Sequence, residues 1–157
     1  MILKKYIHYG SNAFDIDKFD QVKNDLYASI FKPIGGFWAS PVDSENNWHN
    51  WCINNNFRID ELNKSFVFTL LPNSRILSIH TMNDINNAIR QQCRLPLHAR
   101  SSRGIDFEGL IHLGYDAVEV YLDDFDVWQY FYGWDVDSIF IMNPSCMRIV
   151  SNDIQNR

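Results

Sequence analysis

The chain has 157 residues, of which 46% are hydrophobic and 21% are charged, and its formal net charge is −5. This length and composition are typical of one globular domain with a buried core. No apolar run approaches the roughly 20 residues that a membrane-spanning helix needs, and the N-terminus lacks the apolar segment of a signal peptide, so we expect a cytoplasmic protein without membrane partners. The acidic balance argues against nucleic-acid binding by the whole surface, which needs a basic face.

The cysteines and histidines follow no disulfide or metal-binding pattern. The three cysteines, Cys52, Cys93 and Cys146, are far apart, and the five histidines include no pair at i, i+4 spacing. An odd number of isolated cysteines fits a reducing compartment and argues against a disulfide framework or a structural zinc site. We therefore expect no metal site.

Charge is segregated along the chain. Residues 90–103 carry four arginines and no acid, whereas residues 105–140 carry nine carboxylates and no lysine or arginine. This pattern suggests a polarised surface or a cleft between two types of charge. The alternative is that each segment presents a plain solvated face.

The chain begins with a strand and an ambiguous apolar segment. Leu3–Tyr9 is predicted as a strand, rich in tyrosine and isoleucine, that stops at Gly10. Phe14–Val22 has apolar residues at a spacing that fits a short helix or an irregular segment, with Asp15 as its cap.

A double glycine at residues 35–36 enters a short aromatic strand, which Pro41 ends. Glycine at this place lets another backbone or a ligand approach closely, or it forms a bulge. Ser44 is predicted to cap the following helix, in which Trp48 and Trp51 share one face. Core packing is the alternative explanation for this tryptophan pair.

The second half of the chain mixes strands with helices. The predicted strands are Ser65–Leu71, Arg75–Ile79, Tyr115–Leu122, Ser138–Met142 and Met147–Val150. Asn83 or Asp84 is predicted to cap one helix, which Pro96 stops, and a second helix runs from its cap Asp106 to Gly114. Residues 123–133 are predicted to be a long acidic loop with a helical turn.

These elements predict one α+β domain over residues 1–150, followed by a polar tail at residues 151–157. Regular β-α-β alternation is absent, which argues against a doubly wound fold. The sequence contains no glycine-rich dinucleotide fingerprint, no P-loop and no Gly-x-Ser-x-Gly elbow.

Three stretches together resemble a known family. They are the His8-Tyr9-Gly10-Ser11 turn, the Gly-Gly-aromatic-Ala-Ser strand at residues 35–40, and the ending that runs from Gly114 to Glu119 and from Gly133 to Pro144. In this order they resemble the ADP-ribosyltransferase superfamily of the diphtheria-toxin and PARP type, including its small bacterial and phage members. The resemblance implies a fold of split mixed β-sheets with a few short helices.

The resemblance also implies an NAD-binding cleft. His8 would bind the adenosine ribose, the backbone of Tyr9 or Gly10 would pair with the nicotinamide amide, and Ser11 would assist there. The remaining residues that it places near the nicotinamide or along the pocket wall are Gly36, Phe37, Trp38, Ser40, Trp48 and Trp51.

An acid must then stabilise the oxocarbenium-like transition state as nicotinamide leaves. The position that matches the family falls on Asp137, where a shorter aspartate replaces the usual glutamate. Glu119 and Asp135 are the alternatives. Each acid also has a structural interpretation without a catalytic role. Glu119 could be a solvated carboxylate on the polar face of its strand, and Asp135 and Asp137 could only cap or twist the start of the last long strand.

The resemblance implies a mono-ADP-ribosyltransferase, a glycosyltransferase that breaks the nicotinamide–ribose bond of NAD and passes ADP-ribose to a target macromolecule. A phage or mobile-element effector that acts on a host protein fits the small size, and the loops at residues 97–104 and 123–133 are candidates for recognising that target. One alternative is a catalytically weak relative that inhibits a partner protein by binding it. A further alternative is an RNA 2′-phosphotransferase-like enzyme, for which only residues 90–103 offer the needed basic charge.

Overall fold

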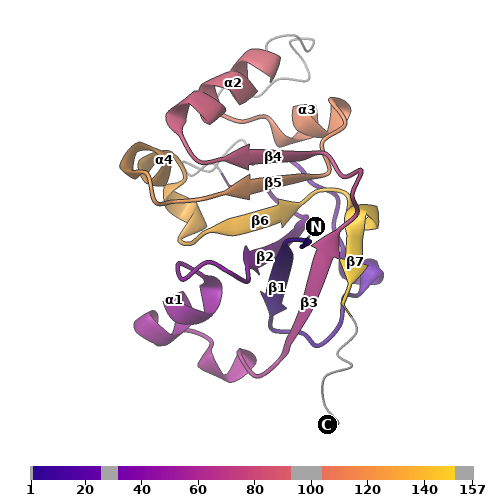
Figure 1. The fold of residues 1–157 in the computed structure, drawn as a ribbon, viewed down its shortest axis with the longest axis vertical. Helices are drawn as coiled ribbons and strands as arrows, with labels where there is room; N and C mark the ends of the chain where they lie inside the picture. The colour runs from indigo at the N-terminus through magenta and orange to yellow at the C-terminus, as the bar shows by residue number, and fades with distance from the viewer. Residues whose placement is uncertain (1, 26–31, 93–103, 151–157) are drawn as a thin grey trace.

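A seven-stranded mixed sheet forms the centre of the protein. The computed structural model describes residues 2–25, 32–92 and 104–150. The strand order across the sheet is β4-β5-β6-β2-β1-β3-β7. The strands are β1 (Lys5–Tyr9), β2 (Phe37–Pro41), β3 (Ser65–Leu70), β4 (Ile76–Ile79), β5 (Ala117–Val120), β6 (Ser138–Ile141) and β7 (Met147–Ile149). In Figure 1, β4, β5 and β6 run across the view while β1, β3 and β7 run steeply, so the sheet is strongly bent.

The pairing of these strands is antiparallel except between β4 and β5, which are parallel. This mixed sheet agrees with the predicted α+β class. β2 pairs with β1 on one side and with β6 on the other, so the strands form one continuous sheet rather than two separate ones.

The helices of the described residues are α1 (Trp48–Asn55), α2 (Met82–Gln92), α3 (Phe107–His112) and α4 (Phe125–Tyr130). The helices α2, α3 and α4 pack against the part of the sheet that contains β4, β5 and β6, whereas α1 lies beside β1 and β2 (Figure 1). Short 3-10 turns are η1 (Ile16–Lys18), η2 (Ile59–Glu61), η4 (Tyr132–Trp134) and η5 (Pro144–Cys146). None of the described helices is long and apolar enough to span a bilayer.

Two hydrophobic cores lie on opposite faces of β5 and β6, whose residues are all buried. Val118 and Phe140 belong to the first core, with residues of α2, α3 and α4. Ile139 and Ile141 belong to the second core, with Tyr6 and residues of β3. Because side chains alternate along a strand, one short strand supplies both cores.

Of the two alternatives for Phe14–Val22, the structure shows the irregular segment, which contains a three-residue 3-10 turn at Ile16–Lys18 that Asp15 caps. Phe14 packs against the second core, whereas Val22 is buried in the first. The segment must therefore pass from one core to the other, which a short helix with a single apolar face cannot do.

Two predicted helix caps are wrong. Asn83 and Asp84 lie inside α2, which begins at Met82, and Asp84 in its first turn accepts from the Thr81 N–H.

Ser44 does not cap α1 either. The helix begins at Trp48, and the Asn47 side chain accepts the capping hydrogen bond from the Asn50 N–H. Ser44 lies in the preceding turn and binds Asp137 instead. The caps at Asp106 and the stop at Gly114 are confirmed: Asp106 accepts from the Gly109 N–H, and Gly114 has φ +86°.

Some sequence predictions fall outside the described residues. These are the end of the helix at Pro96, three of the four arginines of residues 90–103, Cys93, almost all of the loop at residues 97–104 and the C-terminal tail. Within the acidic stretch, residues 123–133 contain more helix than a single turn, because α4 and η4 follow each other there.

Candidate functional site

The site begins where β1 and β2 part from each other. Their ladder pairs Tyr6 with Pro41 and Ile7 with Ser40 and goes no further, whereas β1 stays paired with β3 as far as Tyr9. Beyond the last pair, the Nδ1 of His8 is 2.7 Å from the carbonyl oxygen of Trp38. A side chain therefore takes the place of the next ladder hydrogen bond, and the two strands open into a cleft.

The unpaired end of β1 presents backbone groups to this cleft. In an antiparallel ladder, the N–H and C=O of one residue point to the same neighbouring strand, and this direction alternates along the chain. The Lys5 carbonyl accepts from the Val42 N–H on the β2 side, and the Gly10 N–H donates to the Lys64 carbonyl on the β3 side. The N–H and C=O of Tyr9 consequently point toward β2, where the ladder gives them no partner.

A cavity of about 320 Å³ occupies this opening. Its aromatic walls are Tyr9, Trp38, Trp48 and Trp134. Trp38 and Trp134 meet edge to face with ring centroids 4.6 Å apart. Trp48 is stacked on Trp51 at 5.1 Å, so the second ring supports the wall from behind. Flat apolar surfaces of this kind suit a planar ring.

Four charged residues line the same cavity: Lys32, Arg58, Glu61 and Asp135. The Lys32 ammonium lies 5.1 Å from the centroid of the Trp38 ring, and Arg58 lies 3.9 Å from the Glu61 carboxylate. Asp135 is exposed and makes no hydrogen bond or ion pair within the described residues. The cavity therefore offers two cations for an anionic group and one carboxylate whose oxygens are free.

Two of the cavity residues have a strained backbone. Arg58 has φ +46° and Asp135 has φ +62°, and Asn56 is the only other non-glycine residue with positive φ in the described part of the chain. Such conformations are costly for residues with a Cβ and concentrate at functional sites.

His8 is held as a neutral ring. Burial lowers the pKa of His8 from its ordinary value of 6.5, and the hydrogen bond to Trp38 partly opposes this. A carbonyl oxygen only accepts, so the Nδ1 of His8 must carry the proton. This tautomer leaves Nε2 as an acceptor.

The structure brings together part of the predicted site. The predicted residues that line the cavity are His8, Tyr9, Trp38, Ser40, Trp48 and Asp135. The predicted residues that do not line it are Gly10, Ser11, Gly36, Phe37, Trp51, Glu119 and Asp137.

The glycines outside the cavity have structural partners. A Cβ on Gly36 would lie 2.3 Å from the Phe140 ring, and one on Gly35 would lie 2.4 Å from the Gln21 carbonyl oxygen. Both have positive φ. The double glycine therefore admits another backbone and a core ring, and the ligand alternative finds no support at these positions. The N–H of Gly10 is already used by the Lys64 carbonyl.

Ser11 and Phe37 are likewise engaged elsewhere. The Ser11 hydroxyl donates to the Ala13 carbonyl at 2.6 Å, within its own turn. The Phe37 ring packs against the second core, 4.4 Å from the His8 ring and 5.8 Å from Phe66. Phe37 thus supports His8 from the face that the cavity does not use.

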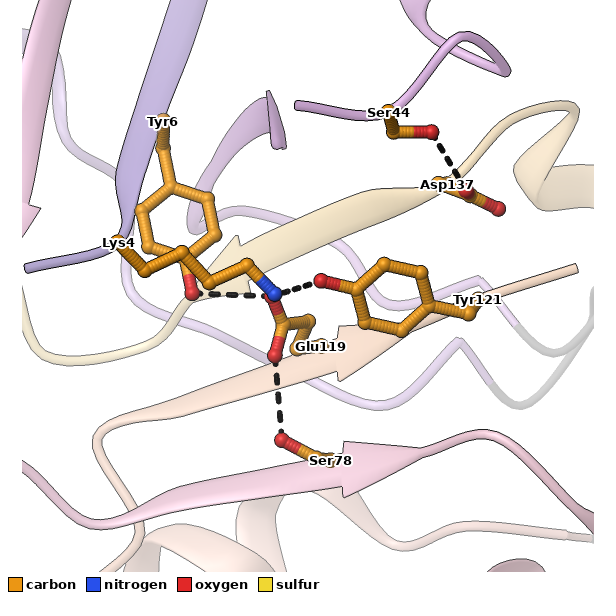
Figure 2. Close-up of polar contacts among 7 residues, drawn as sticks. All are labelled: Lys4, Tyr6, Ser44, Ser78, Glu119, Tyr121 and Asp137. Carbon is orange, nitrogen blue, oxygen red and sulfur yellow. Dashed lines mark hydrogen bonds and ion pairs between the residues drawn. The ribbon is translucent and has the colours of Figure 1, made fainter. Parts of the chain in front are cut away.

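The carboxylate of Asp137 ties three segments together. Its Oδ2 accepts from the Ser44 hydroxyl at 2.6 Å (Figure 2). Its Oδ1 accepts from the Asn46 amide at 3.1 Å and from the Leu122 N–H at 2.8 Å. Both oxygens are occupied, and they fix the turn before α1 to the ends of β5 and β6.

Glu119 is a buried carboxylate and not the solvated one that its strand position allowed. It is 4% exposed, and it accepts from the hydroxyls of Tyr6 at 2.9 Å, Tyr121 at 2.8 Å and Ser78 at 3.1 Å. The Lys4 ammonium lies 2.6 Å away. Figure 2 shows these groups converging on Glu119 while Ser44 and Asp137 form a separate pair.

Sequence reasoning missed Lys32, Arg58, Glu61 and Trp134 as cavity residues. Trp134 stands in the Gly-Trp-Asp run that carried part of the resemblance, so its place next to Asp135 was the available signal. Lys32, Arg58 and Glu61 come from connecting segments without a motif. Their placement depends on turns that no local pattern predicts.

Comparison with protein-family models, with curated proteins and with solved structures yields no match. No group of three or more His, Cys, Asp or Glu side chains is arranged to hold a metal ion in residues 2–25, 32–92 and 104–150.

Proposed function

We propose that this protein binds NAD in the cleft between β1 and β2 and acts as a mono-ADP-ribosyltransferase. The observation that carries the proposal is the opening of the β1–β2 ladder at Tyr9. A primary carboxamide such as that of nicotinamide needs one donor and one acceptor side by side. The backbone of Tyr9 offers both in one plane, next to the aromatic walls of the cavity.

The cavity suits the nicotinamide-ribose half of the dinucleotide. Its volume of about 320 Å³ is at the lower end of the range for small-molecule sites, roughly 300–1,000 Å³. The other half then extends toward the open side. Lys32 and Arg58 supply the positive charge that a diphosphate requires, and the free Nε2 of His8 accepts a ribose hydroxyl.

Asp135 is the acid that we assign to bond cleavage. Among the three candidate acids it alone lines the cavity, and its oxygens are free of hydrogen bonds within the described residues. The bond from ribose C1′ to the pyridinium nitrogen breaks, and its electron pair leaves with neutral nicotinamide. The carboxylate opposes the positive charge that develops on the ribose. A lone pair of the acceptor then forms the new bond to C1′, and the acceptor proton passes to water.

The test measures nicotinamide release and transfer of label from NAD, using wild-type protein and Asp135→Asn. We expect the substitution to lower the rate about 100-fold or more, because it removes the opposing charge and keeps the size of the side chain. Asp17→Asn is the matched control, since Asp17 is an exposed acid on η1 away from the cavity. Folded wild-type protein that releases no nicotinamide would contradict the proposal, and equal rates for Asp135→Asn would contradict the assignment of Asp135.

A further inference from the structure

A row of exposed aromatic side chains lies beside the cleft. Phe125, Trp128 and Tyr132 are 66%, 39% and 65% exposed. Their rings contact one another, with centroids 5.9 Å apart for the first pair and 5.8 Å apart for the second. We call these three side chains on α4 and η4 the aromatic face. Contiguous apolar surface of this kind marks an interaction site on a protein more often than scattered residues do.

The surroundings of the aromatic face are acidic. Asp123, Asp124 and Asp126 are exposed and precede or begin α4. Asp124 accepts the capping hydrogen bonds of the helix. No ion pair involves these three acids within the described residues, and the sequence has no lysine or arginine from residue 105 to residue 147. Within the described residues, the negative charge of this surface is therefore not neutralised by a lysine or an arginine.

Aromatic rings together with carboxylates that form no ion pair within the described residues select a cationic partner. Guanidinium groups stack on aromatic rings and pair with carboxylates at the same time, which ammonium groups do less well. Phosphates are repelled by the same carboxylates, so the surface does not suit a nucleic acid. We propose that the aromatic face docks an arginine-rich segment of a partner protein.

The position of this face relates it to the cleft. η4 ends at Trp134, and the next residue is Asp135, so the chain runs directly from the aromatic face into the cavity wall. In Figure 1, α4 and α1 lie along the same side of the molecule, and α1 contributes Trp48 to the cavity. This inference rests on the proposed function only in one respect, namely that the docked segment would bring the ADP-ribose acceptor to the cleft.

The binding test uses the full chain without NAD and a fluorescein-labelled peptide of repeated Arg-Gly-Ser units. Fluorescence anisotropy should show binding that weakens as salt rises, and no binding of the Glu-Gly-Ser counterpart. Replacing two anchors in Phe125→Ser/Tyr132→Ser should weaken binding about tenfold or more. Ile149→Ser removes an apolar side chain from β7 that is 48% exposed and lies outside the aromatic face. This control variant should bind as the wild type does.

Several results would overturn the docking proposal. One is that the Arg-Gly-Ser and Glu-Gly-Ser peptides bind equally well. Another is that the double variant, shown by circular dichroism to be folded, binds with unchanged affinity. A third is that the wild type self-associates and the double variant does not. The last outcome would make a second copy of the chain the occupant. Because the titration contains no NAD, peptide binding without nicotinamide release would refute only the transferase proposal, and nicotinamide release without peptide binding only the docking proposal.

Discussion

The three candidate acids have different roles, and these roles follow their burial. Glu119 and Asp137 are buried and use their oxygens to hold strands and turns together, whereas Asp135 is exposed and strained at the cavity wall. A buried carboxylate is stable only when hydrogen bonds and a counter-charge replace its lost hydration. Glu119 obtains these from the hydroxyls of Tyr6 on β1, Ser78 on β4 and Tyr121 just after β5, and from Lys4, which precedes β1.

Glu119→Ala should lower the free energy of unfolding by about 3 kcal/mol or more, because it leaves the buried Tyr6 hydroxyl and its neighbours without an acceptor. Lys4→Ala should cost only about 1 kcal/mol, since Lys4 is 37% exposed and solvent screens its charge. Urea denaturation of both variants measures these values. A Glu119→Ala protein as stable as the wild type would mean that this polar cluster does not hold the sheet together.

The lowered pKa of His8 predicts how the free energy of unfolding depends on pH. Its folded-state pKa is lowered below 6.5 by burial, so the unfolded chain takes up a proton more readily as the pH falls below that value. Stability is therefore fully present above pH 6.5 and decreases as the pH falls through the folded pKa.

His8→Gln removes this titration while keeping a polar side chain. The free energy of unfolding, measured in urea between about pH 7.5 and pH 5, should decrease less with falling pH in the variant than in the wild type. Identical slopes for the two proteins would show that His8 has the same pKa in the folded and unfolded states.

At the scale of elements, the cleft exists because β1 and β2 share only a short ladder. Pro41 lies opposite Tyr6, where the β1–β2 ladder needs no N–H, because the adjacent hydrogen bond runs from the Val42 N–H to the Lys5 carbonyl. On its other side β2 remains paired with β6. The glycines before β2 allow that pairing, because Gly36 lies directly against Phe140.

Gly36→Ala should destabilise the protein by about 3 kcal/mol, since the new methyl group collides with a core ring at a backbone angle that also disfavours a Cβ. Gly114→Ala is the control for strain alone. Its φ is +86°, but its Cβ would meet only the Arg75 guanidinium at 3.7 Å, so a loss of about 1 kcal/mol is expected. Equal losses in thermal or urea unfolding would indicate that crowding at Phe140 is relieved by a small shift.

The sequence predicts those elements whose signals are local. The apolar alternation at Ser65–Leu70, the cap at Asp106 and the turn at Gly114 all depend on neighbouring residues, and they appear in the structure at nearly the expected places. Phe14–Val22 was not predictable in this way, because its apolar residues serve two cores that form only in the folded chain.

The residues of the candidate site can be separated in the same way, into those with a local sequence signal and those placed only by the folded chain. The strand-end residues His8 and Tyr9 and the tryptophan wall at Trp48 could be predicted from the sequence, because a strand end or a helix places each of them. Lys32 and Arg58 enter the cavity from irregular segments, and their contribution depends on backbone angles that the sequence does not reveal. The burial of Glu119 was equally hidden, since its partner Tyr6 is far away in the chain.

The whole molecule combines two cores, one bent sheet and a cleft at the place where the ladder between β1 and β2 ends. The first core holds α2, α3 and α4, the last of which carries part of the aromatic face, and the second core lies behind His8. Cavity and aromatic face thus share the segment from α4 to β6. This arrangement places a candidate reaction centre and a candidate docking surface next to each other on one chain of 18.5 kDa.

The most direct test of the NAD cleft is a titration of ¹⁵N-labelled protein with NAD, followed by NMR. The Tyr9 amide and the indole N–H signals of Trp38, Trp48 and Trp134 should shift most, because the nicotinamide amide binds the Tyr9 backbone and its ring lies among these walls. Amides of β7 serve as the internal reference and should not move. A saturating titration that leaves Tyr9 unchanged, or that shifts only residues outside the cavity, would contradict the account.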